Sequence, residues 1–138
     1  MTGGADVAEV IEGNGKLEPG DVVEVDPNDN NRFRLAATPN STAVAGVIST
    51  LPGVTLNTKD AADSPTNTGP RLALAGRVPV RVTAEHGFIR PGDLLLASST
   101  PGHAMRASTD PKPGTVVGKA LGRLDEATGV IEMLAMPR

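Results

Sequence analysis

The sequence predicts an all-β domain, built as a short-stranded sandwich or barrel or as a β-clip-like fold, with an internal pseudo-duplication. Three observations predict this class. Gly and Pro make up 28 of the 138 residues and are spread throughout, which argues against long helices. Between them lie short runs rich in Val, Leu, Ile and Ala, the pattern of short strands separated by turns. Finally, residues 15–51 match residues 87–123 without a gap, at a constant separation of 72 positions.

Each repeated unit begins with a Pro-Gly-Asp motif that leads into a strand. Pro presets φ at the first central position of a turn and Gly tolerates positive φ at the next, so turns are expected at residues 19–21 and 91–93. The two aspartates of these motifs, Asp21 and Asp93, are interpreted as turn residues. Apolar residues follow directly in both copies, which predicts the first strand of each unit.

The later strands of each unit also carry matching residues. The return strand contains one arginine, Arg34 or Arg106. Such an arginine could pair with an acid across a subunit boundary, bind an anion, or lie exposed with its stem over apolar surface, and the last interpretation is favoured. The third strand contains a Val-x-Gly motif, in which Gly46 and Gly118 indicate a β-bulge or a close approach of another backbone.

Alternation of residue types is clearest in residues 77–82, where three valines share one face. We expect this face to lie in the core or in an oligomer interface. Pro79, on the other face, lacks an N–H, so the strand is expected at a sheet edge or with that residue pointing away from the ladder. In two other apolar strands, Glu24 and Glu132 predict a face that meets water. The three valines are Val78, Val80 and Val82.

The length of the chain is that of one domain, so residues 1–138 are interpreted as a single β-domain. Residues 52–70 are polar, small and nearly free of large apolar groups. They predict a flexible loop that connects the two halves, and a connector is favoured over a binding loop.

Composition argues against several classes of function. The net charge is −3 and the acids and bases are interspersed, so the basic stripe that nucleic-acid binding needs is absent. There is no cysteine, which excludes disulfides and thiolate zinc sites. No apolar run approaches the roughly 20 residues of a membrane span, and the first six residues lack the regions of a signal peptide. Neither a nucleic acid nor a membrane is therefore expected as a partner.

The shortage of aromatic residues bears on assembly. The chain has two Phe and no Tyr or Trp, so its core must be built from aliphatic side chains and Met. A small aliphatic β-domain of this kind often gains further buried area between subunits. We therefore expect an oligomer, with the chain itself as its own partner.

Candidate reactive residues are few. Asp6 and Glu9 lie three positions apart; on a strand they would face opposite sides, whereas around a turn they could converge for acid–base chemistry. His86 and His103 stand beside glycines at turns and lack the further ligands that a metal site needs. Residues 98–100, Ser-Ser-Thr, lack a Gly-x-Ser-x-Gly elbow. The sequence therefore favours no catalytic residue and predicts no metal and no cofactor.

Six blocks along nearly the whole chain resemble a known group: 6–9, 17–23, 44–49, 74–82, 91–95 and 100–105. They look like a C-terminal module of large bacterial and phage-related tail-fibre or surface proteins. More distantly, the chain is similar to the self-cleaving C-terminal domain of phage neck-appendage proteins, the G2 peptidase family. Those fibrous proteins are homotrimers, so the resemblance implies a homotrimer. In the self-cleaving relatives an Asp-x-Ala-Glu-type stretch contributes the carboxylates, which by this resemblance are Asp6 and Glu9 here.

The function that we expect is structural rather than enzymatic. The chain would be a trimerising C-terminal module of a phage-like fibre or surface protein, located on a virion-like particle or outside the cell if it is attached to a fibre. One alternative is an intramolecular autoprotease that uses Asp6 and Glu9. Another is a protein like those that decorate phage capsids, since β-clip modules of that kind share the short strands and Pro-Gly-Asp turns as a fold-level analogy.

Overall fold

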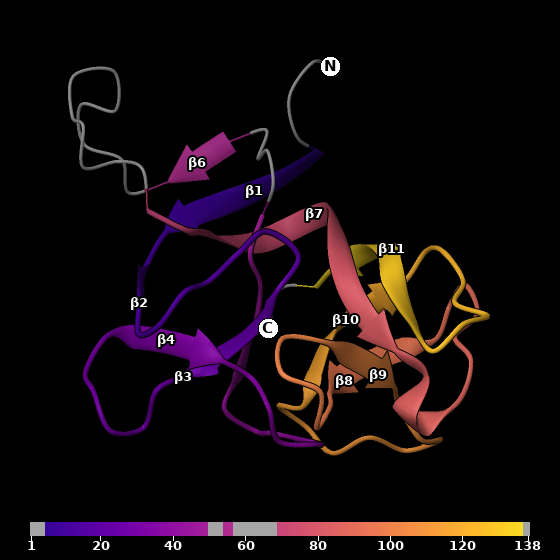
Figure 1. Cartoon of the computed structure of the whole chain (residues 1–138). Helices are drawn as coiled ribbons and strands as arrows, with labels where there is room; N and C mark the ends of the chain where they lie inside the picture. Colours follow the sequence, from indigo (N-terminus) through magenta and orange to yellow (C-terminus); the bar gives the residue numbers. More distant parts are fainter. Residues whose placement is uncertain (1–4, 50–53, 57–68, 137–138) are drawn as a thin grey trace.

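The computed structural model describes residues 5–49, 54–56 and 69–136 (Figure 1). The predicted all-β class is confirmed, because 49% of the chain is strand and 3% is helical. The helical part of the described ranges is one 3₁₀ turn, η1 (Ala84–His86). The strands are β1 (Ala5–Val10), β2 (Glu12–Gly13), β3 (Val22–Val25), β4 (Arg32–Leu35), β5 (Val44–Val47), β6 (Val54–Leu56), β7 (Arg71–Thr83), β8 (Leu94–Ala97), β9 (Ala104–Arg106), β10 (Val116–Ala120) and β11 (Thr128–Ala135).

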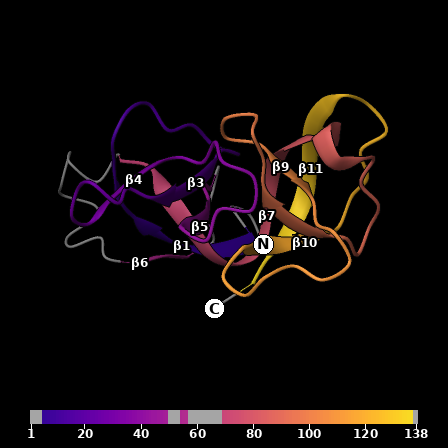
Figure 2. The same cartoon turned by 90° about the horizontal axis from the view of Figure 1, so that it is seen from below.

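From here on, the first repeat includes β1 to β6 with the first half of β7, and the second repeat includes the second half of β7 with β8 to β11. The second repeat, taken in this way, forms a closed barrel of five strands. Its strands follow the order β11–β10–β8–β9–β7. The ring closes because β11 also pairs with the second half of β7, from Thr128 opposite Thr83 to Ala135 opposite Gly76. Figures 1 and 2 show this barrel as the half of the molecule that contains β8 to β11.

The first repeat arranges equivalent strands in the same order. Strands β4, β3 and β5 pair antiparallel, as β9, β8 and β10 do in the second repeat. β1 pairs with the first half of β7, and its continuation β2 runs parallel to β4. Between β5 and β7 the ring is joined by one bridge, Ile48 opposite Leu72, and by the Ser49 N–H, which donates to the carbonyl of Arg71 at 2.7 Å. The first ring is thus held by fewer ladder pairs at this seam.

Strand β7 belongs to both repeats and passes from one to the other (Figure 1). The expectation that it lies at a sheet edge is wrong, because it pairs with β1, β9 and β11. The alternative for Pro79 holds instead. Arg81, two residues further on, donates its N–H away from β11 to the carbonyl of Gly20 at 2.9 Å. Since alternate residues point their N–H groups to the same side, the Pro79 nitrogen also points away from β11.

The two Pro-Gly-Asp turns have the same hydrogen bonds. The Asp21 N–H donates to the carbonyl of Glu18 at 3.0 Å, and the Asp93 N–H donates to that of Arg90 at 3.1 Å. In return, each aspartate Oδ2 accepts the N–H of the same partner residue at 2.8 Å. Positive φ at the intervening glycine permits this geometry. The φ values are 89° at Gly20 and 96° at Gly92.

Both Val-x-Gly strands contain a β-bulge directly before the glycine. The register shifts at Ala45 in β5 and at Val117 in β10, two positions that are 72 residues apart. A Cβ on Gly118 would lie 2.5 Å from the carbonyl oxygen of Leu134, so no larger residue fits there without movement. The bulge and the close approach that the motif predicted therefore occur together.

The larger of two apolar clusters spans both repeats and fills the closed barrel. Val78, Val80 and Val82 lie in this cluster, with 1%, 0% and 0% of their surface exposed. Their burial is within one chain, so these valines are not available to a neighbouring subunit. The smaller cluster lies in the first repeat and consists of Ile11, Val23, Ile48 and Leu72.

Most of the predicted connecting loop, residues 52–70, lies outside the described residues. The described part is not all loop, because β6 pairs in parallel with β1, from Val54 opposite Val7 to Leu56 opposite Glu9. β6 therefore extends the sheet of the first repeat beyond β1 (Figure 1).

Candidate functional site

Asp6 and Glu9 do not meet within one chain. They lie on strand β1, where residues three apart point to opposite faces. Asp6 is buried, as is Ala8 on the same face, whereas Glu9 is half-buried on the other face. One subunit therefore offers a single buried carboxyl here and not a convergent acid–base pair.

The Asp6 carboxyl is under-satisfied. Its Oδ2 atom and the nearby Ser49 Oγ atom are both buried, and neither has a hydrogen-bond partner among the residues that the structure describes. Burial raises the pKa of Asp6, against smaller lowering effects from the Ser49 hydroxyl and from the Asp6 backbone N–H. The hydroxyl is thus close enough to influence the charge of Asp6 without making a well-formed hydrogen bond. A carboxyl in this setting can hold a proton at a pH where an exposed aspartate has lost it.

The prediction that Glu24 faces water is wrong, because only 4% of its surface is exposed. Two side chains satisfy its carboxylate: Arg34 Nε donates to Oε2 at 2.8 Å, and Ser41 Oγ donates to Oε1 at 2.8 Å. Arg34 also reaches Asp26, at 3.8 Å between Nη1 and Oδ1. The repeat-paired Arg34 is therefore committed to acids of its own chain.

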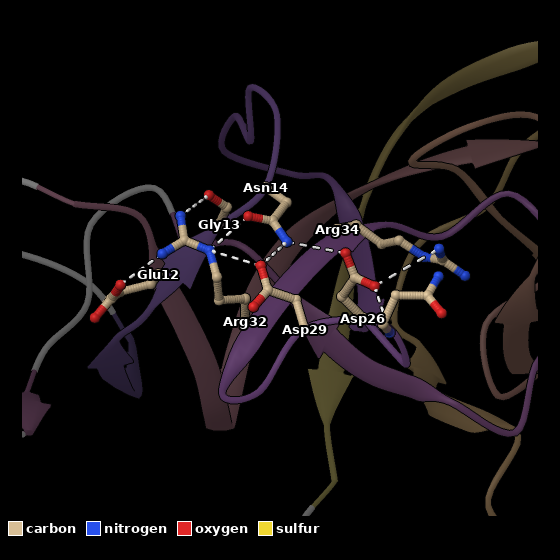
Figure 3. A network of polar contacts seen from close by, with 8 residues as sticks. Glu12, Gly13, Asn14, Asp26, Asp29, Arg32 and Arg34 are labelled. Carbon is tan, nitrogen blue, oxygen red and sulfur yellow. Dashed lines mark hydrogen bonds and ion pairs between the residues drawn. The ribbon is translucent and has the colours of Figure 1, made fainter.

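A polar network extends from Arg34 and Asp26 along the edge of the first repeat (Figure 3). Asn14 Nδ2 donates to Asp26 Oδ2 at 2.9 Å and to Asp29 Oδ2 at 3.1 Å. Arg32 binds the carboxylate of Glu12 at 2.7 Å and the carbonyl of Gly13 at 2.8 Å. The bond from Asn14, followed by the N–H of Asn28, lowers the pKa of Asp26. These contacts fasten β2 and the β3–β4 hairpin loop to one another.

Arg106 differs from its counterpart Arg34. It is exposed, and it forms no ion pair with any residue that the structure describes. Its carbonyl oxygen lies 2.8 Å from Nδ1 of His86. Arg34 pairs with Glu24, but the residue at the equivalent position in the second repeat, 72 residues later, is Leu96. Arg106 therefore lacks the acidic partner that Arg34 has. Arg106 therefore fits the exposed-strand interpretation.

Arg81 joins the two repeats and was not singled out from the sequence. Its Nε atom lies 3.6 Å from Oδ1 of the buried Asp21, and its Nη2 atom lies 3.9 Å from Oε1 of Glu18. Asp21 therefore does more than shape its turn, because its carboxylate also faces a cation from β7. Asp93 has no such partner among the ion pairs of the described residues. The only signal for Arg81 was its place on the polar face of the Val78–Val82 alternation.

The side chains of the serine-rich turn and of the two histidines contact nearby backbone: Nδ1 of His86 lies 2.8 Å from the carbonyl oxygen of Arg106, and Nδ1 of His103 lies 2.9 Å from that of Pro101. Ser98 Oγ donates to the carbonyl of His103 at 2.7 Å, and Glu85 accepts the Ser99 N–H and the Thr100 hydroxyl, both at 3.1 Å. Burial raises the pKa of Glu85, but the bonds from Ser99 and Thr100 outweigh it and leave that pKa lowered. Within the described ranges, no three His, Cys, Asp or Glu side chains gather as a metal site would require. The described helix is also far too short to cross a membrane.

The surface hollows of the described residues are small. One of about 180 Å³ lies between the repeats and is lined by small and apolar residues from β5, β7, β10 and β11. Another of about 250 Å³ lies between the loops at 40–42 and 108–115 and contains the exposed side chains of Asp110 and Lys112. Neither hollow includes Asp6, Glu24 or a histidine.

Comparison with known families finds no family model that matches the chain, and comparison with curated proteins finds none that is similar to it.

Proposed function

We propose that this chain is a structural assembly module, a trimerising C-terminal domain of a phage-like fibre or surface protein. The six sequence blocks that resemble such modules support the proposal. The fold supports it at the level of class, since the chain is a duplicated aliphatic β scaffold. Symmetric association of three copies would fix the register of a chain attached to each copy.

One observation carries the proposal: large apolar side chains remain outside a domain whose cores are already filled. Exposed large apolar side chains that gather on one face are typical of protein interaction sites. Three of the side chains, Val130, Leu134 and Met136, lie on or directly after one strand, β11. The large apolar residues that are exposed are Val25, Phe88, Leu121, Val130, Leu134 and Met136.

Chemical cross-linking of the purified chain at micromolar concentration tests the proposal. The expected result is a dominant product of three chains whose yield is insensitive to dilution over the micromolar range. A chain that stays uncross-linked under conditions that link a known trimer would contradict it. Co-sedimentation with particles would then distinguish a free capsid-decorating trimer from a fibre terminus.

Intramolecular proteolysis is a second candidate, because one observation favours it. Asp6 is a buried, incompletely bonded carboxyl with a raised pKa, a property typical of acid–base residues. Glu9 on the opposite face of β1 would have to act from another subunit or not at all. Expressing the module after its natural upstream sequence, with and without Asp6→Asn, tests this candidate. Cleavage abolished by the variant would support it, and an intact wild-type chain would exclude it.

A further inference from the structure

The sequence contains one Asn-Gly pair, Asn14–Gly15, and it lies directly after β2. In such a pair the backbone nitrogen of the glycine can attack the side-chain amide carbon of the asparagine, because no glycine side chain shields that nitrogen. Gly15 is exposed, and apart from its chain neighbours nothing lies within 4 Å of the place that a Cβ would take. Its N–H donates no hydrogen bond to any residue that the structure describes. The attacking atom of this reaction is therefore free.

The side-chain amide of Asn14, in contrast, is held at both of its ends (Figure 3). Its Nδ2 atom donates one hydrogen to Asp26 Oδ2 at 2.9 Å and the other to Asp29 Oδ2 at 3.1 Å. Its Oδ1 atom accepts the Nε–H of Arg32. The charges fix this orientation, because a reversed amide would turn its hydrogens toward a guanidinium and its oxygen toward two carboxylates. The backbone N–H of Asn14 is bonded as well, to the carbonyl of Phe33 at 2.7 Å.

These contacts oppose the reaction of the amide. Attack makes Cγ tetrahedral, whereas the two carboxylates and the guanidinium are placed to bond a planar amide. Attack also moves negative charge onto the amide, and the network around it contains more carboxylates than guanidinium groups. The departing nitrogen must take up a proton, but the bond from Asn14 lowers the pKa of Asp26, so that this carboxylate is ionised and has no proton to give. The charged members of the network are Glu12, Asp26 and Asp29 against Arg32 and Arg34.

We infer that Asn14 is a deamidation site of this chain and that its hydrogen bonds to Asp26, Asp29 and Arg32 keep it unreacted while the first repeat is folded. When the network opens, a bond forms between the Gly15 nitrogen and Cγ of Asn14, the Cγ–Nδ2 bond breaks, and ammonia leaves with the proton of the Gly15 N–H. Water then opens the resulting succinimide ring at either carbonyl, which leaves an aspartyl or an isoaspartyl linkage at position 14. The inference goes beyond the proposed function and does not depend on it, since every residue involved belongs to one chain.

The product of this reaction cannot replace the amide in the network. A carboxylate at position 14 has no hydrogen to donate to Asp26 or Asp29, so three carboxylates would gather where one amide had bonded two. The amide helps to fasten β2 to the β3–β4 hairpin loop, and this link would be lost. Deamidation at Asn14 therefore converts a stabilising contact of the first repeat into a repulsive one.

Peptide mass spectrometry after incubation at mildly alkaline pH tests the inference. The tryptic peptide that ends at Lys16 contains Asn14 as its only asparagine and has no glutamine, so exchange of its amide NH₂ for OH reports this site alone. We expect modification to be about tenfold or more faster in the urea-unfolded wild type than in the folded wild type. Gly15→Ala should slow the reaction in urea severalfold, because a side chain then shields the attacking nitrogen. A wild type that is modified equally fast in both states, or in neither, would overturn the inference.

Variants of the network separate protection by these contacts from protection by folding in general. Asp29→Ala removes one acceptor of the amide hydrogens, and Arg32→Ala removes the donor to the amide oxygen. Both should speed modification of the folded chain severalfold, with folding checked by circular dichroism. The matched control is Arg106→Ala, at an exposed arginine outside the network, and it should keep the wild-type rate. If Arg32→Ala does not fold, the exposed Asp29 decides alone, and a folded Asp29→Ala chain modified as slowly as wild type contradicts the inference.

Discussion

The two repeats build the same ring of strands but stabilise it by different means. At positions 72 residues apart, the first repeat has Asp6 and Glu24 where the second has Val78 and Leu96, and all four are buried. At the seam equivalent in the two rings, β10 and β11 form three ladder pairs, whereas β5 and β7 form one bridge among the described residues. One backbone plan thus tolerates either an aliphatic interior or buried carboxylates that need partners.

The difference suggests a division of labour. We expect the second repeat to be the more rigid half, because its aliphatic core and closed ladder leave few polar groups to satisfy. The first repeat depends on Arg34, Arg81 and Ser41 to compensate its buried acids. Opening of the first repeat should therefore require less free energy than opening of the second.

The largest expected effect is in the aliphatic half. Leu95 is fully buried, so Leu95→Ala should lower the free energy of unfolding by about 2–5 kcal/mol. The equivalent change in the first repeat, Val23→Ala, removes fewer side-chain carbon atoms and should cost about 1.5–3 kcal/mol. Urea unfolding followed by circular dichroism measures both. A larger loss at Val23 than at Leu95 would reverse the assignment of the rigid half.

The next effect concerns the two arginines. Arg34→Ala leaves the carboxylate of Glu24 buried without its cation and should cost about 1–3 kcal/mol. Arg106→Ala, at the exposed counterpart, should change stability by less than about 0.5 kcal/mol. The double variant Arg34→Ala, Glu24→Leu also replaces the buried carboxylate by the Leu found at the equivalent position 96, and it should recover most of the loss, since apolar replacement of a buried pair is often neutral. Equal losses at both arginines would show that the repeats do not differ in this way.

The buried Asp6 of the first repeat, where the second repeat has Val78, makes the stability of the chain depend on pH. Because its pKa is raised above 3.8 in the folded chain, the native state holds this proton more tightly than the unfolded state does. The stabilising contribution of protonated Asp6 is complete below pH 3.8 and is lost as the pH rises through the folded-state pKa. Asp6→Asn should therefore gain stability relative to wild type at pH 7, by about 1 kcal/mol, and gain less below pH 3.8. Thermal unfolding at the two pH values measures this, and a gain that is independent of pH would contradict it.

The smallest effect separates the two turns. Asp93→Ala removes one hydrogen bond to a backbone N–H and should cost about 0.5–1.5 kcal/mol. Asp21→Ala removes the same bond and also the carboxylate that faces Arg81, so its cost should be larger. Denaturant midpoints of the two variants decide, and identical losses would mean that the contact with Arg81 contributes nothing.

Local chemistry made much of the fold predictable. The Pro-Gly-Asp turns, the bulges before Gly46 and Gly118, and the buried valines of β7 all depend on short-range rules about φ, N–H groups and alternation. The constant spacing of 72 positions predicted which residues of the two repeats correspond to each other. That one strand, β7, is shared by both rings was not predicted, because the alternation was clear only in residues 77–82.

The charged contacts were harder to predict from residue types. From the sequence, Glu24 was expected to face water within an apolar strand. Its burial is stable because Arg34 and Ser41, from other segments, donate hydrogen bonds to its carboxylate. The link from Arg81 to Asp21 joins residues 60 positions apart, which no local pattern reveals. The exposure of Val130 and Leu134 on β11 could not be predicted either, since burial of one face depends on which strands close the barrel.

Sedimentation equilibrium of the wild-type chain tests the central claim most directly, namely that this duplicated scaffold associates with copies of itself. The account predicts a single species with three times the mass of the 14.1 kDa chain at micromolar concentration. A mass equal to that of one chain, unchanged as the concentration is raised, would contradict it.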